Sequence, residues 1–308
     1  MAGPDISVEL LGMRLESPLL LASGVLGETG PSLLSVLEGG AAGVVTKSIG
    51  LEPRNGHPNP TVVTMGHSLM NAMGLPNPGA EAFEEELAWL RDRTDRPVIV
   101  SVFGSDPGEY ADVASRLAPM ASAIELNLSC PHAKGYGAEI GSDPDLLKQV
   151  VRAVTEAVDV PVLAKLTPNT SDIVSLARAA EAGGASGLVA INTLKGMVVD
   201  VDMGVPALAN AYGGLSGEAV RAVGVRCVHE ISSNVEIPVF GVGGVATAKD
   251  ALEYLMAGAQ AVQIGTAIRS NGPGVFTKIA DDMMAWLGSN GLDSLSQVQG
   301  ILVGGGRG

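Results

Sequence analysis

The feature that most constrains the fold is a repeated alternation of short apolar runs with longer amphipathic stretches. Each run is bounded by Gly, Pro or Asp and has the length and β-branched content of a buried strand. Eight such units predict parallel strands joined by helices, and they favour a closed (β/α)8 TIM barrel of the α/β class over an open doubly wound sheet. The predicted strands are LLLASG (19–24), GVVTKS (43–48), PVIVSVFG (97–104), AIELNLS (123–129), VPVLAKL (160–166), GLVAINT (187–193), IPVFGVGG (237–244) and AVQIGT (261–266).

The remaining segments also fit one barrel. ISVELLGMRLES (6–17) alternates around a glycine, which predicts an N-terminal β-hairpin that closes the barrel bottom. Two connections, residues 49–78 and 194–216, are longer than ordinary βα loops, and we expect them to be long active-site loops on the C-terminal face. A length of 308 residues suits a single domain, residues 1–308.

Composition argues against several classes of partner and site. A net charge of −14 disfavours nucleic acid and anionic membrane surfaces, and no apolar stretch is long enough to span a membrane, so we expect a cytoplasmic protein. The two cysteines, Cys130 and Cys227, cannot supply the four thiolates of an ordinary iron–sulfur cluster. No His or Cys lies at metal-ligand spacing from Cys130, so no metal site is predicted.

Polar and glycine residues gather where the predicted strands end. Barrel active sites lie on the rim formed by the carboxyl ends of the strands, so these residues are the candidates for function. They are Ser23, Lys47, Ser101, Asn127, Lys165, Asn192, Gly243 and Gly265.

Glycines at the ends of the last two strands indicate a phosphate site. Gly243 and Gly244 end FGVGG, and Gly265 and Thr266 lie in IGT. Backbone N–H groups can approach a phosphate closely where side chains are absent, and the N-termini of the following helices favour a dianion. The alternative is that these glycines only permit tight turns, but phosphate sites of this fold commonly lie after strands seven and eight.

Cys130 directly follows the fourth strand in NLSCPHAKGYG. Its thiol could be a nucleophile, a metal ligand, a base or a buried small hydrophobe. Cys227 lies in an amphipathic helical run, where we expect it to be structural.

The motifs ASG, TKS, NAMGLPNPG, LNLSCP, KLTPN, INT, GGLSG, GVGG and IGTA, taken in order from residue 6 to about 287, resemble class 1 dihydroorotate dehydrogenases. The resemblance implies oxidation of dihydroorotate to orotate in pyrimidine biosynthesis, with FMN as cofactor, Cys130 as the base and Lys165 as a second catalytic residue. It implies FMN contacts from Ser23, Lys47, Ser48, Ser101, Asn127, Lys165, Ile191, Gly217, Gly243, Gly244, Gly265 and Thr266. The implied substrate-binding residues are Lys47, Asn71, Ala72, Met73, Gly74, Leu75, Asn127, Asn192 and Thr193.

The chain departs from that family at two expected pocket positions, with His132 and Ser101 where Asn is usual. SCPH, AKLTPN and TSDIVSLARAAEAGGASG are also similar to the flavin domain of dihydropyrimidine dehydrogenase, which acts on a neighbouring substrate. NAMGLPNPG and INTLKGMVVD favour dihydroorotate dehydrogenase. A third reading is a non-catalytic barrel that binds a phosphate ligand.

The resemblance also bears on partners. INTLKGMVVD is more similar to the NAD-linked type 1B catalytic subunit than to the fumarate-reducing type 1A enzyme. It therefore implies a homodimer and a separate electron-transfer subunit that carries FAD and a [2Fe–2S] cluster, which agrees with the shortage of cysteines in this chain.

Overall fold

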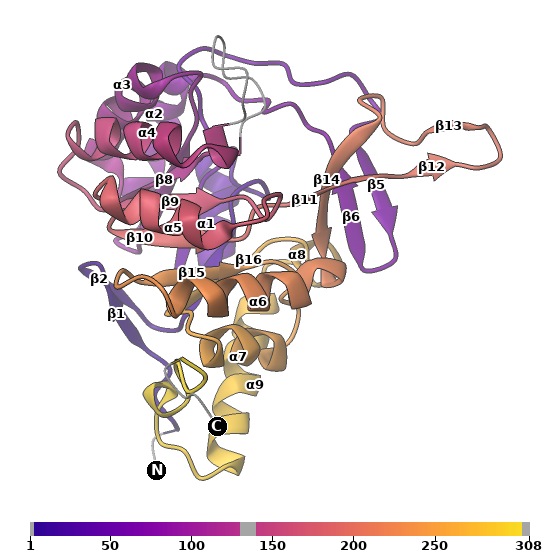
Figure 1. Cartoon of the computed structure of the whole chain (residues 1–308). Coiled ribbons are helices and arrows are strands. Elements are labelled where there is room, and N and C mark those ends of the chain that lie inside the picture. The colour runs from indigo at the N-terminus through magenta and orange to yellow at the C-terminus, as the bar shows by residue number, and fades with distance from the viewer. Residues whose placement is uncertain (1–2, 130–139, 304–308) are drawn as a thin grey trace.

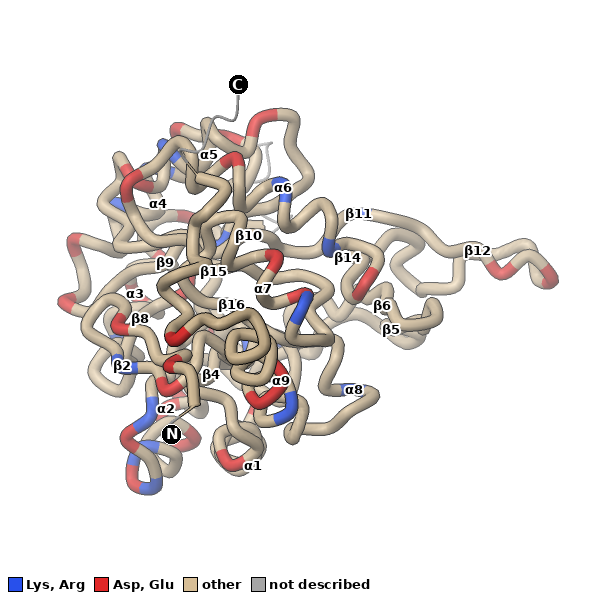
Figure 2. The backbone as a smooth tube through the Cα atoms, turned by 90° about the horizontal axis from the view of Figure 1, so that it is seen from below, with Lys and Arg blue, Asp and Glu red and all other residues tan. Residues whose placement is uncertain are grey.

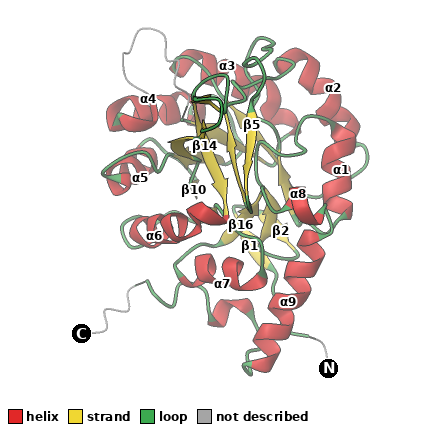
Figure 3. Ribbon diagram, turned by 90° about the vertical axis from the view of Figure 1, so that its right-hand side faces the viewer, coloured by secondary structure: helices red, strands yellow, loops and turns green. Residues whose placement is uncertain are grey.

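The computed structural model describes residues 3–129 and 140–303, and its centre is a closed barrel of eight parallel strands (Figures 1 and 3). The strands follow the order β10-β15-β16-β3-β4-β7-β8-β9, and β9 pairs with β10 to close the ring. All eight predicted strands are present, so the (β/α)8 barrel is confirmed. They are β3 (Leu19–Leu21), β4 (Gly43–Val45), β7 (Val98–Val102), β8 (Ala123–Asn127), β9 (Val162–Leu166), β10 (Gly187–Ala190), β15 (Val239–Val242) and β16 (Ala261–Ile264).

Helices form an outer layer around the barrel (Figure 3). Several begin at a Thr or Asp whose side chain accepts a hydrogen bond from the first turn, as at Thr29, Asp106 and Asp172. Such caps satisfy N–H groups that have no partner within the helix, so they fix where each helix starts. The helices are α1 (Gly30–Glu38), α2 (Ala80–Arg91), α3 (Pro107–Leu117), α4 (Pro144–Thr155), α5 (Ile173–Ala182), α6 (Arg221–Ser232), α7 (Ala248–Met256), α8 (Ile268–Asn271) and α9 (Val275–Ser289).

Two apolar clusters hold the barrel together. One lies between the strands and the helices, and the other fills the barrel interior around Phe240 and Leu20. The hairpin of β1 (Val8–Leu10) and β2 (Met13–Leu15) contributes Leu10 and Met13 to the interior cluster. The predicted hairpin is therefore confirmed, and it closes the end of the barrel opposite the carboxyl ends of the strands.

The two long connections are more ordered than expected. Instead of simple loops they form a four-stranded antiparallel sheet with the order β11-β14-β6-β5, beside the carboxyl ends of the barrel strands (Figure 1). Because backbone pairing joins the two connections, each is fixed by the other. The strands are β5 (Val62–Met65), β6 (Ser68–Asn71), β11 (Leu194–Met197) and β14 (Tyr212–Gly217). A small hairpin of β12 (Val199–Asp200) and β13 (Val205–Pro206) extends outward beyond this sheet.

Acidic positions are spread over the outer elements of the barrel (Figure 2).

No helix in the described ranges is long and apolar enough to cross a membrane. Residues 3–129 and 140–303 contain no group of three or more His, Cys, Asp and Glu side chains that could hold a metal ion.

We expect Phe240→Ala to lower the free energy of unfolding by about 3–5 kcal/mol, because Phe240 is fully buried in the barrel interior and truncation leaves a cavity there. Denaturant unfolding measures the loss. The matched control is Ile301→Ala at a side chain that is half exposed, where the change should stay within about 0.5 kcal/mol. Equal losses in the two variants would contradict the proposed interior packing.

Candidate functional site

A cavity of about 770 Å³ opens at the carboxyl ends of the barrel strands, and the four-stranded sheet supplies part of its wall. The sequence-predicted site residues within the described ranges line this cavity, with one exception. Lining residues are Ser23, Lys47, Ser48, Asn71, Ala72, Met73, Gly74, Leu75, Asn127, Lys165, Ile191, Asn192, Thr193, Gly217, Gly243, Gly244, Gly265 and Thr266. Cys130 and His132 lie outside the described residues.

Ser101 is the exception. Its side chain is fully buried and does not line the cavity. Its Oγ lies 2.9 Å from Ser48 Oγ, and its backbone N–H donates to Thr46 Oγ1 at 3.0 Å. Ser101 therefore supports Ser48, which lines the cavity wall, and its own side chain does not reach the cavity.

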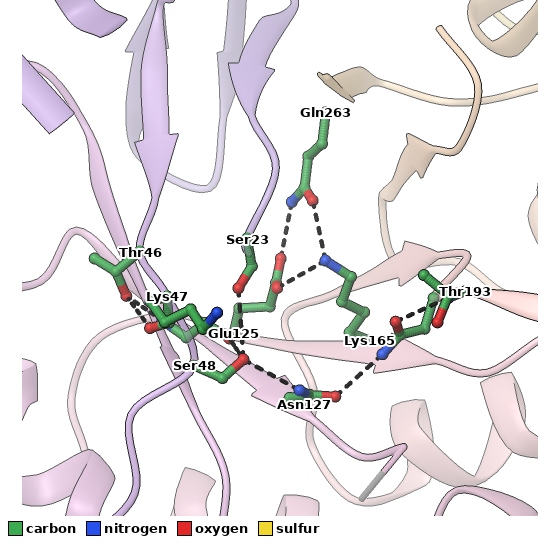
Figure 4. Close-up of polar contacts among 11 residues, drawn as sticks. Ser23, Thr46, Lys47, Ser48, Glu125, Asn127, Lys165, Thr193 and Gln263 are labelled. Carbon is green, nitrogen blue, oxygen red and sulfur yellow. Dashed lines mark hydrogen bonds and ion pairs between the residues drawn. The ribbon is translucent and has the colours of Figure 1, made fainter. Parts of the chain in front are cut away.

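A directional chain of hydrogen bonds runs along one wall of the cavity (Figure 4). The backbone N–H of Thr193 donates to Asn192 Oδ1 at 2.8 Å, which leaves Asn192 Nδ2 to donate to Asn127 Oδ1 at 3.1 Å. Asn127 Nδ2 then donates to Ser48 Oγ at 3.1 Å. Because a backbone N–H can only donate, it fixes the orientation of both amides in this chain. Each amide keeps one further N–H for a ligand.

Three polar side chains meet on the floor of the cavity, deep in the barrel (Figure 4). Lys165 Nζ lies 3.1 Å from Glu125 Oε1 and 3.5 Å from Gln263 Oε1, and Gln263 Nε2 donates to Glu125 Oε2 at 2.8 Å. All three residues are at least nine-tenths buried. Lys165 was expected here from the sequence, whereas Glu125 and Gln263 were missed.

A signal for the missed pair does exist in the sequence. Glu125 and Gln263 each interrupt an otherwise apolar strand, AIELN and AVQI. Polar residues at such buried positions need hydrogen-bond partners.

Lys47 lies on another wall and is also largely buried. Its Nζ is 3.6 Å from Oε1 of Glu28, a residue that is mostly exposed. An exposed partner holds the ammonium weakly, so Lys47 remains able to pair with an anionic ligand.

Asn71, on β6, uses its side-chain amide partly within the protein, since Nδ2 donates to Gly214 O at 3.3 Å. This bond ties the segment 71–75 to the neighbouring strand β14. Gly74 and Leu75 follow with positive φ values of 75° and 57°.

The glycines at the ends of β15 and β16 form a backbone cradle. Gly243 and Gly244 have φ values of 128° and 75°, and a Cβ on Gly244 would lie 2.7 Å from Gly217 O. No described residue accepts a hydrogen bond from the backbone N–H groups of Gly244, Gly265 or Thr266. These N–H groups border the cavity, and free donors of this kind suit a phosphate.

The phosphate prediction also named the N-termini of the helices that follow β15 and β16. At the start of α7, Asp250 Oδ2 accepts from the N–H groups of Ala246 and Thr247, which precede the helix, and Thr247 Oγ1 accepts from Asp250 N. α8, which follows β16, has only four residues. The N–H groups that border the cavity belong to the loops after β15 and β16, and the contribution of the helix N-termini stays a prediction.

Tyr254, on α7, was not predicted and supports this cradle from below. Its side chain is fully buried, and its hydroxyl donates to Gly243 O at 2.7 Å. Burial raises the pKa of the Tyr254 hydroxyl well above its usual value.

Cys227 is free and fully buried on α6, as expected for a structural residue. Burial raises the pKa of its thiol, which keeps the sulfur protonated and unreactive.

Comparison with known proteins decides the family. The family model for dihydroorotate dehydrogenase matches residues 5–287. The chain belongs to the dihydroorotate dehydrogenase family. Three relatives carry the name dihydroorotate dehydrogenase B (NAD(+)), catalytic subunit. The protein from Methanosarcina mazei is 50% identical over 95% of this chain and 93% of its own. Those from Pyrococcus furiosus and Methanocaldococcus jannaschii are 50% and 46% identical over 96% of this chain, and 98% and 97% of their own.

Dihydroorotate dehydrogenases are flavin-dependent oxidoreductases, and the cavity fits such a cofactor. The free N–H groups of the glycine cradle suit the phosphate end of a flavin nucleotide. The buried ammonium of Lys165 and the oriented amides suit polar ring edges.

The pKa of Tyr254 predicts a pH effect on stability. A phenol whose pKa is higher in the folded than in the unfolded state contributes stability fully below about pH 10, and this contribution is lost as the pH rises through the folded value. The ordinary pKa of a tyrosine is about 10, so the comparison runs from about pH 9 to about pH 11. Over this range the unfolding free energy of Tyr254→Phe should fall less than that of the wild type. Denaturant unfolding at several pH values measures this, and parallel curves would contradict the assignment.

Proposed function

We propose that this chain is the catalytic subunit of an NAD-linked dihydroorotate dehydrogenase, which oxidises dihydroorotate to orotate in pyrimidine biosynthesis. The observation that carries the proposal is the set of groups that line the cavity of this chain, which belongs to the dihydroorotate dehydrogenase family. One space joins a backbone phosphate cradle, oriented amides and a buried lysine. Relatives that are 46–50% identical over nearly the whole chain bear the same name, which supports orotate chemistry over the dihydropyrimidine alternative.

We propose FMN as the flavin, held by a single domain that spans residues 1–308. Its phosphate would bind at Gly243, Gly244, Gly265 and Thr266, whose N–H groups border the cavity. The ring would contact residues from several strand ends, including Ser23, Lys47, Ser48, Asn127, Lys165, Ile191 and Gly217. Ser101 would act through Ser48, because its own side chain does not reach the cavity. When bound, FMN supplies the acceptor for the hydride that leaves C6 of the substrate.

The substrate would lie between the floor and the segment 71–75. Asn127 and Asn192 each offer a remaining N–H, so they match carbonyl or carboxylate oxygens of dihydroorotate. Lys47 would pair with an anionic group, and Thr193 and residues 71–75 would complete the wall.

Cys130 would act as the base. Forming the C5=C6 double bond requires that the C5 proton pass to a base while the C6 hydrogen departs with its electron pair. Support for this role comes from the family resemblance of LNLSCP, and the thiol must be ionised to accept the proton.

Anaerobic titration of the purified protein with dihydroorotate tests the function directly. We expect yellow protein whose flavin absorbance bleaches on addition of dihydroorotate and returns with an oxidant. Bleaching by dihydrouracil in place of dihydroorotate would instead support the dihydropyrimidine reading. Colourless protein that stays colourless with FMN would overturn the proposal in favour of a phosphate-binding barrel.

Cys130→Ala should retain FMN and lose most of the rate of flavin reduction by dihydroorotate at neutral pH, because the base is removed. In the wild type this rate should rise with pH through about 8.5, where half of a free thiol is ionised, and level off above it. Stopped-flow absorbance measures both. Cys227→Ala is the matched control, because it removes a thiol that does not line the cavity. Normal reduction in Cys130→Ala would remove Cys130 from this role.

Electrons would pass to NAD+ through a separate subunit carrying FAD and a [2Fe–2S] cluster. The names of the relatives include the words catalytic subunit, which supports such a division of labour. The chain has only two cysteines, too few for an ordinary cluster of its own. The purified chain alone should therefore bleach with dihydroorotate without forming NADH. A cytoplasmic location stays a prediction.

We also propose a homodimer. The hairpin β12–β13 extends from the body of the protein and exposes large apolar side chains, with Val201 85% and Met203 74% exposed (Figure 1). Clustered exposed apolar residues are typical of assembly surfaces.

Val201→Asp combined with Met203→Asp should shift the protein from dimer to monomer, because two carboxylates would have to be buried in the interface. Light scattering after size-exclusion chromatography measures the mass. Glu236→Ala serves as the control. It also changes one charge, but Glu236 lies beside the β1–β2 hairpin at the opposite end of the barrel. A wild-type monomer, or an unchanged dimer in the double variant, would contradict this surface.

A further inference from the structure

Glu125 has no part in the chemistry described above, yet it is a fully buried carboxylate on the cavity floor. It lies in the middle of β8, two residues before Asn127, so both side chains point into the barrel. Lys165 comes from the adjacent strand β9, and Gln263 comes from β16 on the opposite side of the barrel. The three side chains therefore meet across the barrel interior (Figure 4).

Their hydrogen bonds form a closed ring in which every group has a compatible partner. The ammonium of Lys165 faces one carboxylate oxygen of Glu125 and the amide oxygen of Gln263. The amide nitrogen of Gln263 donates to the other carboxylate oxygen. Lys165 has three N–H groups, and the ring uses two of them. The third is left for whatever occupies the cavity.

Stability alone does not account for this ring. Moving two charges out of water costs several kcal/mol per ion, and apolar side chains of similar volume are often as stabilising as a buried ion pair. The layer just beneath is apolar, as Leu163 and Phe240 show, so the barrel interior can be filled without charge at this level. What the ring does provide is a lysine with a fixed position and a compensated charge.

We propose that Glu125 is a positioning residue that, with Gln263, holds Lys165 and sets the net charge that the cavity floor presents to the bound flavin. This inference rests on the proposed function, because it requires a flavin in the cavity. The pair of Lys165 and Glu125 carries no net charge. Reduction adds negative charge to a flavin, so the charge of the floor affects how readily the flavin is reduced.

Glu125→Gln tests the charge, because it keeps the size and shape of the side chain but leaves the ammonium of Lys165 uncompensated. It also replaces one of the two accepting carboxylate oxygens by an NH2 donor, so a control for the lost hydrogen bond is needed. We expect the reduction equilibrium of the bound flavin to shift at least tenfold toward the reduced form. For a two-electron couple this is a rise of about 30 mV in midpoint potential. Anaerobic titration of the purified holoprotein against redox dyes measures it. An unchanged or lower potential would overturn the proposal.

Gln263→Met is the matched control, because it breaks the same ring without changing any charge. Its midpoint potential should stay close to that of the wild type. A shift as large as that of Glu125→Gln would show that the ring acts only through structure, and would overturn the role of charge.

A second variant covers the case in which Glu125→Gln does not fold, since removing one half of a buried ion pair is strongly destabilising. Glu125→Met combined with Lys165→Met removes both charges, an exchange that folded proteins often tolerate. If the two charges compensate each other, its potential should lie within about 30 mV, a tenfold change, of the wild type. A much lower potential would mean that Lys165 acts without compensation, which overturns the proposal.

The same measurements separate this inference from the proposed function. A wild-type protein that binds no flavin would refute the function itself. A wild-type protein that binds flavin and is reduced by dihydroorotate, with a normal potential in Glu125→Gln, would refute only the role of Glu125.

Discussion

Closure of the parallel barrel is the constraint on which the rest of the structure depends. Pairing of β9 with β10 completes the ring, so the carboxyl ends of all eight strands meet at one rim. Residues as distant in sequence as Ser48, Asn127 and Asn192 are thereby brought within hydrogen-bonding distance.

Polarity in the barrel interior is arranged in layers. The hairpin side chains and the lower strand residues form an apolar plug, with Phe240 at its centre. Above it, Glu125, Lys165 and Gln263 satisfy one another, and above them the oriented amides of Asn127 and Asn192 face the cavity. This order keeps buried polar groups paired while leaving a limited number of donors free for a ligand.

Much of this could be predicted from the sequence, because the signals were local. Apolar runs bounded by glycine gave the strands, and Gly243 and Gly244 marked the cradle. The accessory sheet was missed because its pairing is between β6 and β14, and no local pattern specifies a partner so distant along the chain. Glu125 and Gln263 each interrupt an apolar strand, but the sequence does not show that they pair with each other across the barrel. Tyr254 was not predicted, because nothing in its own helix indicates that its hydroxyl donates to Gly243 O.

The accessory sheet has a consequence for how the protein folds. The sheet joins Asn71 to Gly214, which lie 143 positions apart in the chain. Contacts between such distant segments carry a large loop-closure entropy and form late unless other structure brings the segments together first. The barrel does so here, because both segments leave from its rim. Pairing of the wall over the cavity therefore depends on the barrel having formed first, so the stability of the wall is tied to that of the barrel.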